Sequence, residues 1–438
     1  MRSAAAAWLA LRPTQQLVIG FAGYALLGTL LLLLPVAQAA PAHPIDHLFN
    51  IVSAISTTGL TTISVRDWYT PFGQLVILAM FQVGGIGFMT ISSVLILARG
   101  RTLSDSRVSI LKAGFALPHY FRIHHFVRQV VAYTLITETV GALILWWRFA
   151  HHGIENPLWS AIFHSVSAFA TAGFSLNNNS LEPFAHDWIV NLTIGALCTA
   201  GAIGFIVFQD VWYSIKLRER MLTLTSKVIL WTTAIVFVGA TGLLLITDST
   251  TAHLPMGERV LACLFQAMTA STTAGFNTIP IGAIPASALV VLMVAMLIGA
   301  SPSGTGGGIK TTTVSAILAN LISVLRGRSS VVWLGHQVPL QRVLYAFAAA
   351  SLYLVLLALG VMALTLSERA DFLQIVFEAA SAIGTVGLSM GITGDLSIAG
   401  KLILIVLMFA GRVGPLTIGL ALLRPERDAP TRVDDIAV

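Results

Sequence analysis

A five-position pattern occurs four times in this chain, and it constrains the fold more than any other feature. Each copy begins with Phe, and Ser or Thr follows after four residues, Ala after five, Thr after eight and Gly after ten. The copies run over residues 49–59, 163–173, 265–275 and 377–387. Such agreement is hard to obtain by chance. It predicts four similar structural units in one chain.

The four copies stand between long apolar segments. Of the 438 residues, 56% are hydrophobic and 10% are charged, whereas about 25% of the residues in a soluble domain are charged. Segments long enough to cross a bilayer lie at about 17–36, 72–98, 127–149, 188–213, 228–247, 286–324, 342–366 and 400–423. The first is long enough to be a retained helix and not a signal peptide. We therefore expect an all-α polytopic membrane protein with eight transmembrane helices.

Basic residues are concentrated in alternate connections between these segments. Lys and Arg gather before residue 17, at 99–128, at 216–227, at 326–342 and after 424. By the positive-inside rule, both termini face the cytoplasm and all four copies of the pattern face outward. The expected location is the plasma (inner) membrane, with lipid as the surroundings. Nucleic-acid binding is not expected, because the net charge of +6 is spread over these flanks and forms no stripe.

The stretch that leads into each copy is short, apolar and compatible with a helix. About 11 residues, at about 1.5 Å per residue, reach only about half-way through the hydrocarbon core. Asp46, Asn156 and Asp371 stand at the expected N-caps. Each unit is therefore predicted to be a helix, a half-helix, a pore loop and a second helix, with four pseudo-symmetric units around one central pore. The predicted units are residues 1–112, 113–220, 221–328 and 329–424, followed by a cytoplasmic tail at 425–438.

A second glycine signal follows inside the second span of three units. It reads GGIGF at 84–88, GAIGF at 201–205 and GRVGP at 411–415. The third unit carries GASPSGTGGGIKTTT at 299–313 in its place. This run is not a phosphate-binding loop, because Ile309 separates Gly308 from Lys310 and an apolar helix precedes it where a strand is required.

Four irregular loops around one axis can take the place of a cation's hydration shell. Irregular backbone at membrane depth must line a wet cavity or be buried in protein. Rings of carbonyls coordinate dehydrated cations, and Gly reaches the positive φ that turns successive carbonyls the same way. The half-helices also end at the loops, so their C-terminal dipoles favour a cation there. The candidate filter residues are Thr57, Thr58, Gly59, Thr171, Ala172, Gly173, Thr273, Ala274, Gly275, Thr385, Val386 and Gly387.

The segment TVGLS at 385–389 is close to the TVGYG signature of potassium filters. With this organisation, the chain resembles the Trk/Ktr/HKT superfamily of potassium transporters over nearly its full length, and it is most similar to the Ktr-type membrane subunit. The resemblance implies that the four Thr-x-Gly segments form a K⁺ selectivity filter. It also implies a preference for potassium, because Ser at the position of Gly59 goes with sodium preference in the family.

The Gly-rich run of the third unit looks like the intramembrane loop of that family. The resemblance implies a flexible gate beneath the filter, with Lys310 on its cytoplasmic side and Arg412 projecting toward it. The implied gate residues are Ser301, Ser303, Gly304, Thr305, Gly306, Gly307, Gly308, Lys310 and Arg412. Arg412 is also a candidate on physical grounds, because a charge at mid-membrane costs at least about 2.5–3.5 kcal/mol. It can repel cations, bind loop carbonyls or tie two helices together.

Three further features have no assigned function. Glu138 and Glu378 are charges inside apolar segments, and structural roles are favoured for both, with anchoring of the filter or a more negative local potential as alternatives for Glu378. The segment HYFRIHH at 119–125 has a spacing that does not place its histidines on one helix face, so partner docking or headgroup contact is favoured over a metal site.

The expected cargo is K⁺, driven through a channel-like path by the membrane potential. Stimulation by Na⁺ is left open. No covalent cofactor and no transition metal are expected. The resemblance implies that a nucleotide acts only through a separate cytoplasmic ring subunit of the RCK type, and that the membrane subunit pairs as a homodimer.

Two other classes were weighed against this interpretation. An alternating-access secondary cation transporter also uses broken helices, but such folds usually show two inverted repeats, whereas four copies here share one orientation. A sodium-conducting member of the same superfamily is the other alternative. A membrane-embedded enzyme is not expected, because the sequence has no His-Glu-x-x-His, Gly-x-Ser-x-Gly or paired intramembrane Asp motif.

Overall fold

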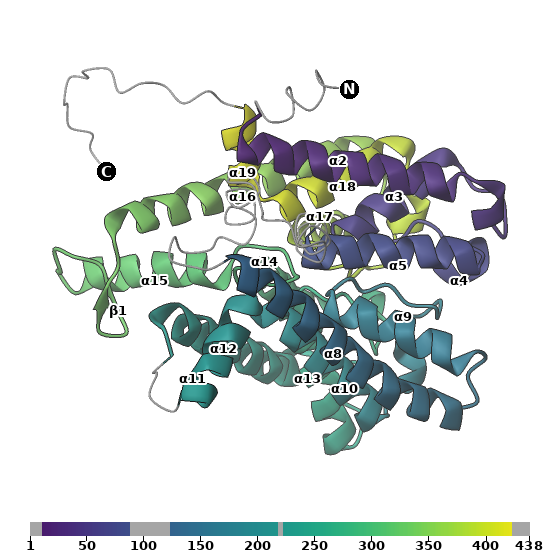
Figure 1. Cartoon of the computed structure of the whole chain (residues 1–438), viewed down its shortest axis with the longest axis horizontal. Helices are drawn as coiled ribbons and strands as arrows, with labels where there is room; N and C mark the ends of the chain where they lie inside the picture. The colour runs from purple at the N-terminus through teal and green to yellow at the C-terminus, as the bar shows by residue number, and fades with distance from the viewer. Residues whose placement is uncertain (1–10, 88–122, 218–221, 423–438) are drawn as a thin grey trace.

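The computed structural model describes residues 11–87, 123–217 and 222–422, and these residues are mostly helical (Figure 1). The predicted unit boundaries at 112 and 220, the tail at 425–438, the end of the predicted span 72–98 and most of the segment 119–125 lie outside the described residues.

Each unit contributes a long helix, a half-helix and a second helix. The first unit has α2 (Pro13–Leu32), η1 (Pro35–Ala37), α3 (Pro44–Ile55), α4 (Val65–Trp68) and α5 (Pro71–Ile86). The second has α8 (Ile123–His151), α9 (Pro157–Phe169), η2 (Glu182–Phe184), α10 (Trp188–Ile203) and α11 (Phe205–Leu217). The third has α12 (Leu224–Thr247), α13 (Met256–Ser271), η3 (Ile281–Ala283), α14 (Ala286–Leu297) and α15 (Thr311–Leu325).

A small hairpin leads from the third unit to the fourth. Its strands are β1 (Val332–Trp333) and β2 (His336–Gln337), which pair antiparallel. The fourth unit has α16 (Leu340–Ser367), α17 (Phe372–Gly384), η4 (Thr393–Asp395), α18 (Ile398–Val413) and α19 (Pro415–Leu422). With α15 and α16, the hairpin projects from one side of the molecule (Figure 1).

The half-helices α3, α9, α13 and α17 have 12, 13, 16 and 13 residues. At about 1.5 Å per residue they are too short to cross a hydrocarbon core of about 30 Å. Asp371 is the N-cap of α17 and forms a capping box with Gln374. Asn156 occupies the N-cap of α9 in a left-handed conformation, and its side chain caps nothing among the described residues.

The prediction that Asp46 caps the first half-helix is wrong. Pro44 begins α3 at its first position, so His43 is the N-cap and its Nδ1 accepts a hydrogen bond from the amide of Ile45. Asp46 lies in the first turn, where its carboxylate pairs with Lys401 of the fourth unit at 2.7 Å.

The two spanning helices of a unit differ in kind. In the described residues, four uninterrupted helices are long and apolar enough to cross a membrane, and they lie within α2, α8, α12 and α16. These are the first helices of the four units. The predicted continuous spans at 188–213 and 400–423 are instead bent by 93° and 92°, between α10 and α11 and between α18 and α19. The predicted interruption of the span 286–324 is confirmed, with a loop at 298–310 between α14 and α15.

The second glycine signal marks the breaks in these helices. Its last glycine ends the helix at positive φ in three units, at Gly87 (86°), Gly204 (95°) and Gly414 (90°). Its first glycine lets the second helix approach the end of its own half-helix. A Cβ on Gly84, Gly201 or Gly411 would collide with the carbonyl oxygen of Ile55, Phe169 or Ile383, respectively.

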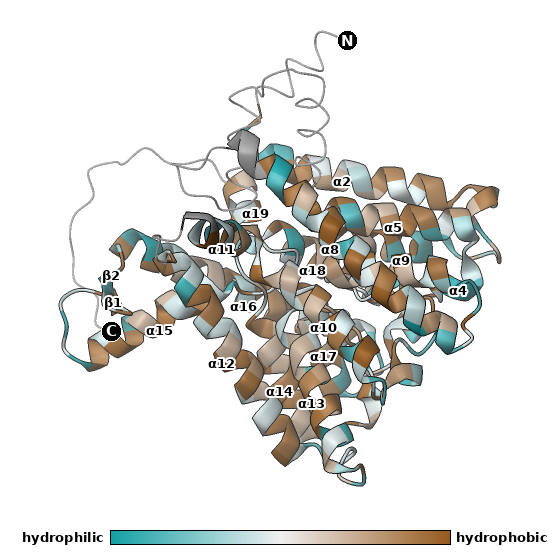
Figure 2. Ribbon diagram, turned by 60° about the horizontal axis from the view of Figure 1, so that its bottom comes forward, coloured by the Kyte–Doolittle hydropathy of each residue, from teal (hydrophilic) through white to brown (hydrophobic). Residues whose placement is uncertain are grey.

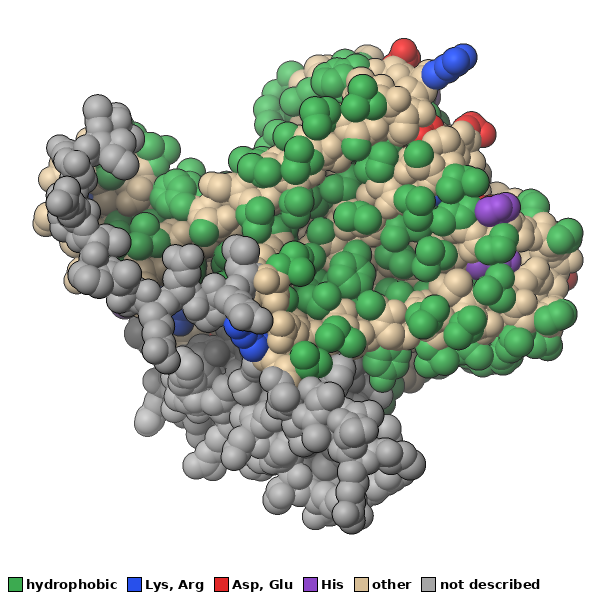
Figure 3. All heavy atoms as spheres, turned by 90° about the horizontal axis from the view of Figure 1, so that it is seen from above, with side chains coloured by type: hydrophobic (Ala, Val, Ile, Leu, Met, Phe, Trp, Pro, Cys, Tyr) green, Lys and Arg blue, Asp and Glu red, His purple; other side chains and the backbone are tan. Residues whose placement is uncertain are grey.

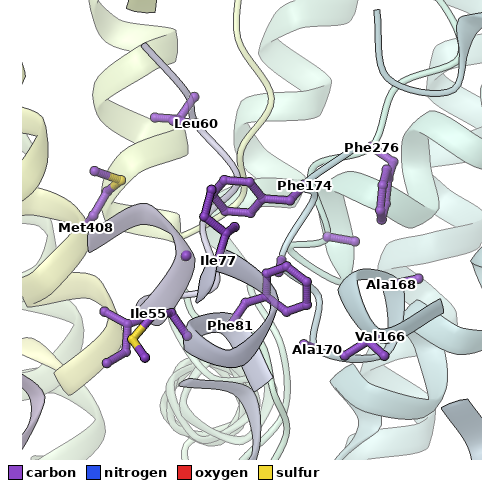
Figure 4. Close-up of a cluster of buried hydrophobic side chains, with 14 of the residues drawn as sticks. Ile55, Leu60, Ile77, Phe81, Val166, Ala168, Ala170, Phe174, Phe276 and Met408 are labelled. Carbon is purple, nitrogen blue, oxygen red and sulfur yellow. The ribbon is translucent and has the colours of Figure 1, made fainter. Parts of the chain in front are cut away.

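The units pack in a closed circle. The second helix of each unit packs on the half-helix of the next, as α5 on α9, α10 on α13, α14 on α17 and α18 on α3. The last described helix, α19, also packs on the first described helix, α2 (Figure 1). Buried aromatic side chains fill the joint between the first two units, where Phe81 of α5 meets Phe163 of α9 at 5.4 Å and stacks on Phe174 at 5.9 Å (Figure 4).

The outer surface of this ring is apolar. Exposed large hydrophobic side chains lie on each first helix, for example Leu26, Ile136, Trp231 and Leu366. Brown, hydrophobic residues dominate the outer helices in Figure 2, and green side chains cover most of the described face in Figure 3. A surface of this kind suits lipid and not water as its solvent. The core that positions the central site therefore lies between the units.

Candidate ion filter and gate

The four Thr-x-Gly segments meet as a closed ring at the centre of the molecule. A Cβ on Gly59 would lie 2.6 Å from the carbonyl oxygen of Ala172, and a Cβ on Gly173 would lie 2.6 Å from that of Ala274. In the same way Gly275 faces the carbonyl of Val386, and Gly387 faces that of Thr58. The segments therefore follow one another in chain order around one axis, and the fourth closes on the first.

The backbone of each segment alternates in handedness. The four glycines have φ of 98°, 68°, 82° and 95°, as the sequence predicts. The four threonines, Thr57, Thr171, Thr273 and Thr385, are also left-handed, with φ of 54°, 50°, 56° and 49°. Left-handed threonine is rare, and no pattern in the sequence predicts it. One residue of negative φ lies between each pair.

A polar cavity of about 440 Å³ opens directly above the ring. All four filter glycines line it, and most of the other lining groups are hydroxyls and amides, among them Ser175, Asn177, Asn277 and Ser389. Among the described residues that line it, Glu182 alone is acidic. We refer to this cavity as the vestibule. Its walls can hydrogen-bond the water around a cation that is about to enter the ring.

The outer loop of the second unit joins its two neighbours above the ring. The Asn178 amide accepts from the Ser64 hydroxyl at 2.6 Å and donates to Asp67 at 2.8 Å in the first unit. On the other side, Asn277 of the third unit donates to Glu182 at 2.9 Å, and its backbone carbonyl accepts from the amide of Leu181. These bonds hold three of the four units together at the vestibule.

The loop between α14 and α15 lies directly beneath the ring and touches all four filter threonines. The hydroxyl of Thr57 donates to the carbonyl of Thr305 at 3.2 Å, and the hydroxyls of Thr171 and Thr305 are 3.1 Å apart. The amide of Gly307 donates to the hydroxyl of Thr273 at 3.1 Å. A Cβ on Gly307 would collide with the hydroxyl of Thr385. In this structure the loop closes the inner end of the ring.

The same loop fills the bend between α10 and α11. The amides of Ser301 and Thr305 donate to the carbonyls of Ala202 and Gly201, both at 3.0 Å. Ser303 in turn accepts from the first amides of α11, through its carbonyl from Phe205 at 3.3 Å and through its hydroxyl from Ile206 at 3.1 Å. At the bend, backbone carbonyls at the end of α10 and amides at the start of α11 lack partners within their own helices, and the loop supplies hydrogen bonds to them.

Arg412 binds the loop from below, and Lys310, the last residue of the loop, binds it from within. The Arg412 guanidinium donates to the carbonyls of Thr305 and Gly84, and to the hydroxyl of Thr57 at 3.1 Å. The Lys310 ammonium donates to the carbonyl of Gly306 at 2.6 Å. Two of the expected roles of Arg412 agree with these contacts: it binds a loop carbonyl, that of Thr305, and it ties α18 to α5 through the carbonyl of Gly84. Both side chains therefore donate hydrogen bonds to carbonyl oxygens, the same kind of oxygen that coordinates a metal ion.

The other predicted gate residues lie in the same loop. Gly308, at φ 70°, lies against Gly299, and Gly304 lies against the carbonyl of Ala202. All predicted filter and gate residues except Arg412 therefore fall in the ring or in the loop beneath it, and Arg412 reaches the loop from α18. Glu138 lies elsewhere, between α8 and α5, where its carboxylate accepts from Gln82 at 2.9 Å.

One repeated position was recognised from the sequence only in the fourth unit, at Glu378. The residue directly after the repeated Phe is polar in every unit, although it lies in an apolar helix. It is Asn50, His164, Gln266 and Glu378, and all four side chains are buried. Aligning the four copies at this position, and not only at the identical ones, would have found it.

The described residues include no group of three or more His, Cys, Asp or Glu side chains that could hold a metal ion. The oxygens gathered at the ring and the loop are backbone carbonyls and threonine hydroxyls, which suit a hard cation that passes through better than a transition metal that stays.

Comparison with known proteins gives one consistent result. Residues 13–427 match the family model described as "TrkH: Cation transport protein". The Ktr system potassium uptake protein B of Bacillus subtilis is 36% identical, over 96% of this chain and 95% of that protein. The potassium/sodium uptake protein NtpJ of Enterococcus hirae is 33% identical, over 94% and 93%.

A solved structure shares the fold. The crystal structure of the potassium transporter TrkH from Vibrio parahaemolyticus superposes with a TM-score of 0.74, covering 94% of this chain and 84% of that chain at 21% sequence identity. The likeness supports the pseudo-symmetric helical membrane architecture that the fourfold pattern predicts.

Proposed function

Because this chain belongs to the TrkH family of cation transport proteins, we propose that it is the ion-translocating membrane subunit of a potassium uptake system. K⁺ enters the vestibule, sheds water at the ring of Thr-x-Gly carbonyls and passes inward when the loop at 298–310 moves aside. The membrane potential drives this flow at about 2.3 kcal/mol per 100 mV for each charge. The observation that carries the proposal is the closed ring of four segments with the loop bound beneath it.

The chemistry of the ring supports a K⁺ filter. Carbonyl oxygens replace the hydration shell of a cation without adding a charge that would hold it too tightly. Glycine at Gly59, Gly173, Gly275 and Gly387 allows each segment to lie against the next carbonyl. Relatives named for potassium uptake cover almost the whole chain, which further supports potassium as the cargo.

The loop acts as the gate in this proposal. It contacts all four filter threonines, and Arg412 holds it there, while Lys310 bonds Gly306 within the loop itself. Opening requires these bonds to break, so the present arrangement corresponds to a closed pore. The parts around it form one closed ring, so a local movement of the loop is a simpler opening step than the rocking of two halves that alternating access requires.

A sodium-conducting function is the second candidate, because one relative is named a potassium/sodium uptake protein. The same relative leaves open whether Na⁺ stimulates K⁺ uptake in this chain. Gly59 favours potassium, since all four units then present the same glycine at the ring.

The assembly is also part of the proposal. We place both termini in the cytoplasm of the plasma (inner) membrane, on the basic side of the chain. Two copies pair as a homodimer in lipid and dock on a separate cytoplasmic ring subunit of the RCK type, through which a nucleotide controls the gate. Relatives named as one protein of a Ktr system support a multi-subunit complex.

The test is potassium-limited growth and ion uptake. The chain is expressed, with and without a Ktr-type ring subunit, in bacteria that lack their own potassium uptake systems. Wild type should restore growth at limiting K⁺. Gly59→Ser should lower the preference for K⁺ over Na⁺, because its Cβ would press on the carbonyl of Ala172. Absence of rescue, despite membrane expression with the ring subunit present, would contradict the proposal and favour another cation or alternating access.

A further inference from the structure

Each half-helix carries a buried polar residue directly after its repeated Phe. Asn50, His164, Gln266 and Glu378 are exposed by 0%, 0%, 1% and 0%. A polar group buried in this way needs hydrogen-bond partners, because burial without them costs free energy. All four find their partners in one kind of place, the outer loop that follows their own filter glycine. We refer to these four residues as the anchor ring.

The anchors of the first and fourth units make the most bonds. The Asn50 amide donates to the carbonyl of Ile63 at 3.1 Å and accepts from the amide of Thr62 at 3.2 Å. The Glu378 carboxylate accepts from the hydroxyl of Ser389, from the amide of Met390 at 3.1 Å and from the hydroxyl of Thr393 at 3.0 Å.

The anchors of the second and third units make fewer bonds to the outer loop. The His164 Nε2 lies 2.9 Å from the hydroxyl of Ser175, while its Nδ1 contacts the carbonyl of Ser160 within α9. The Gln266 amide donates to the hydroxyl of Thr278 at 3.4 Å, and its Oε1 has no partner among the described residues.

The anchored residues begin two or three positions after each filter glycine. Ser175, Ser389, Met390 and Thr393 also line the vestibule directly. The anchors therefore fix the outer end of each Thr-x-Gly segment, while the loop at 298–310 contacts the inner end. The spacing of the carbonyls depends on how firmly both ends are held.

On the basis of the proposed filter, we propose that the anchor ring determines ion selectivity, with Glu378 as its strongest member. The four side chains are positioning residues, because they reach the ion path only through the outer loops. They hold the ring at the diameter that suits K⁺. A ring that relaxes inward fits Na⁺ better, and a ring that widens fits Na⁺ with its water shell better. Either change lowers the selectivity for K⁺ over Na⁺.

Two substitutions of Glu378 separate positioning from charge. Glu378→Gln removes the charge but keeps an acceptor for Ser389 and Met390, and its amide can donate to the hydroxyl of Thr393. Glu378→Met has a similar length and no hydrogen-bonding group for these partners. If positioning matters, the glutamine variant keeps the selectivity that the methionine variant loses.

The experiment compares K⁺ and Na⁺ uptake by these variants, reconstituted in liposomes at equal protein amounts. Glu378→Met should lower the ratio of K⁺ to Na⁺ uptake by about tenfold, the equivalent of about one lost hydrogen bond. Glu378→Gln should stay within about twofold of wild type. Gln266→Met should lower the ratio by about two- to threefold, since it loses a single long bond. This last variant also serves if Glu378→Met does not fold.

Glu138→Gln and Glu138→Met are the matched controls. Glu138 is also a buried carboxylate with an amide partner, but it contacts neither the filter nor the vestibule. Both controls should keep the wild-type ratio, even where they lower the thermal stability of the protein.

The possible results separate the two proposals. An active wild type with unchanged selectivity in Glu378→Met and Gln266→Met would overturn the positioning role alone. Equal loss in Glu378→Gln and Glu378→Met would assign the effect to charge and overturn it too. A wild type that takes up no K⁺ would overturn the proposed function, and this inference with it.

Discussion

At the scale of single residues, the filter threonines are the most unusual feature of the chain. Each adopts a left-handed backbone, which costs a non-glycine residue about 1–3 kcal/mol. Three of their hydroxyls hydrogen-bond the gate loop. The strain therefore lies where the loop at 298–310 meets the Thr-x-Gly segments.

The close contact of each filter glycine with the next unit gives the first prediction. Gly173→Ala should abolish most K⁺ uptake, because its Cβ would lie 2.6 Å from the carbonyl of Ala274. Gly153→Ala is a matched control, since Gly153 has the same φ of 68° but nothing within 4 Å of the added atom. It should cost only the left-handed strain of about 1 kcal/mol, measured by thermal unfolding, and leave uptake intact. Equal uptake by both variants would contradict a packed ring.

The bonds of Arg412 to the gate loop give the second prediction. Arg412→Met removes its bonds to Thr305 and Gly84, so the loop should leave the filter more often. We expect the rate of K⁺ uptake without a ring subunit to rise by about tenfold, as for the loss of one or two hydrogen bonds to a charged group. Arg412→Lys keeps the charge but lacks the forked geometry of the guanidinium, so its uptake rate should lie between those of wild type and Arg412→Met. A lower rate at equal membrane expression would show that Arg412 is not a closing contact.

At the scale of elements, sequence patterns predicted helices well and their breaks poorly. The half-helices follow from short apolar stretches of which two begin with a proline, as at Pro44 and Pro157. The bends at Gly204 and Gly414 did not follow, because the residues on both sides are apolar and read as one span. What makes the bend at Gly204 stable is the loop of the third unit, which satisfies the exposed helix ends through Ser301, Ser303 and Thr305. The hydrophobic periodicity of one span does not indicate a contact of this kind with another unit.

A charged cluster at the start of α10 gives the third prediction. Asp187 caps α10 through the amides of Ile189 and Val190, and it pairs with Arg148 at 2.6 Å and with His152 at 2.7 Å. Burial alone would raise the pKa of Asp187, but these hydrogen bonds hold it below its ordinary value.

The sign of the pH dependence follows from that lowered pKa. The carboxylate stabilises the fold fully above the ordinary aspartate pKa of about 3.9, and this contribution is lost as the pH falls through the lower folded value. The melting temperature of wild type should therefore drop more steeply below about pH 4 than that of Asp187→Asn. Asparagine still caps the helix, so the comparison isolates the charge. Parallel curves for the two proteins would contradict the role of the ion pairs.

At the scale of the whole molecule, the fourfold pattern predicted the architecture. The chain is a helical membrane transport protein of the TrkH family and not an enzyme, in agreement with the sequence. The order of the units around the circle could not be predicted from the sequence. It depends on pairs such as Asp46 and Lys401, which are 355 positions apart and belong to no motif. The same holds for the anchor ring, whose four members share polarity but no residue type.

The ion pair that closes the circle gives the fourth prediction. Asp46 of α3 and Lys401 of α18 lie 2.7 Å apart, with side chains exposed by 10% and 13%. Asp46→Asn and Lys401→Met should each lower the stability of the protein, and the double variant should lose less than the sum. We expect a coupling energy of about 1–3 kcal/mol in a double-mutant cycle followed by thermal unfolding. Strict additivity would mean that the pair does not join the first and fourth units.

The circular packing of the units has a consequence for how such a pore can be controlled. Four separate copies of one unit, each laying its second helix on the half-helix of its neighbour, would build the same circle, but every change would then appear four times. Joining the copies in one polypeptide removes that restriction. Here one unit alone carries the long loop, another alone carries Arg412, and the outer bridge of Asn178 belongs to a third. A single chain can thus keep four similar units around a spherical ion, while features that occur in one unit only, such as the loop at 298–310, make the units differ outside the ring.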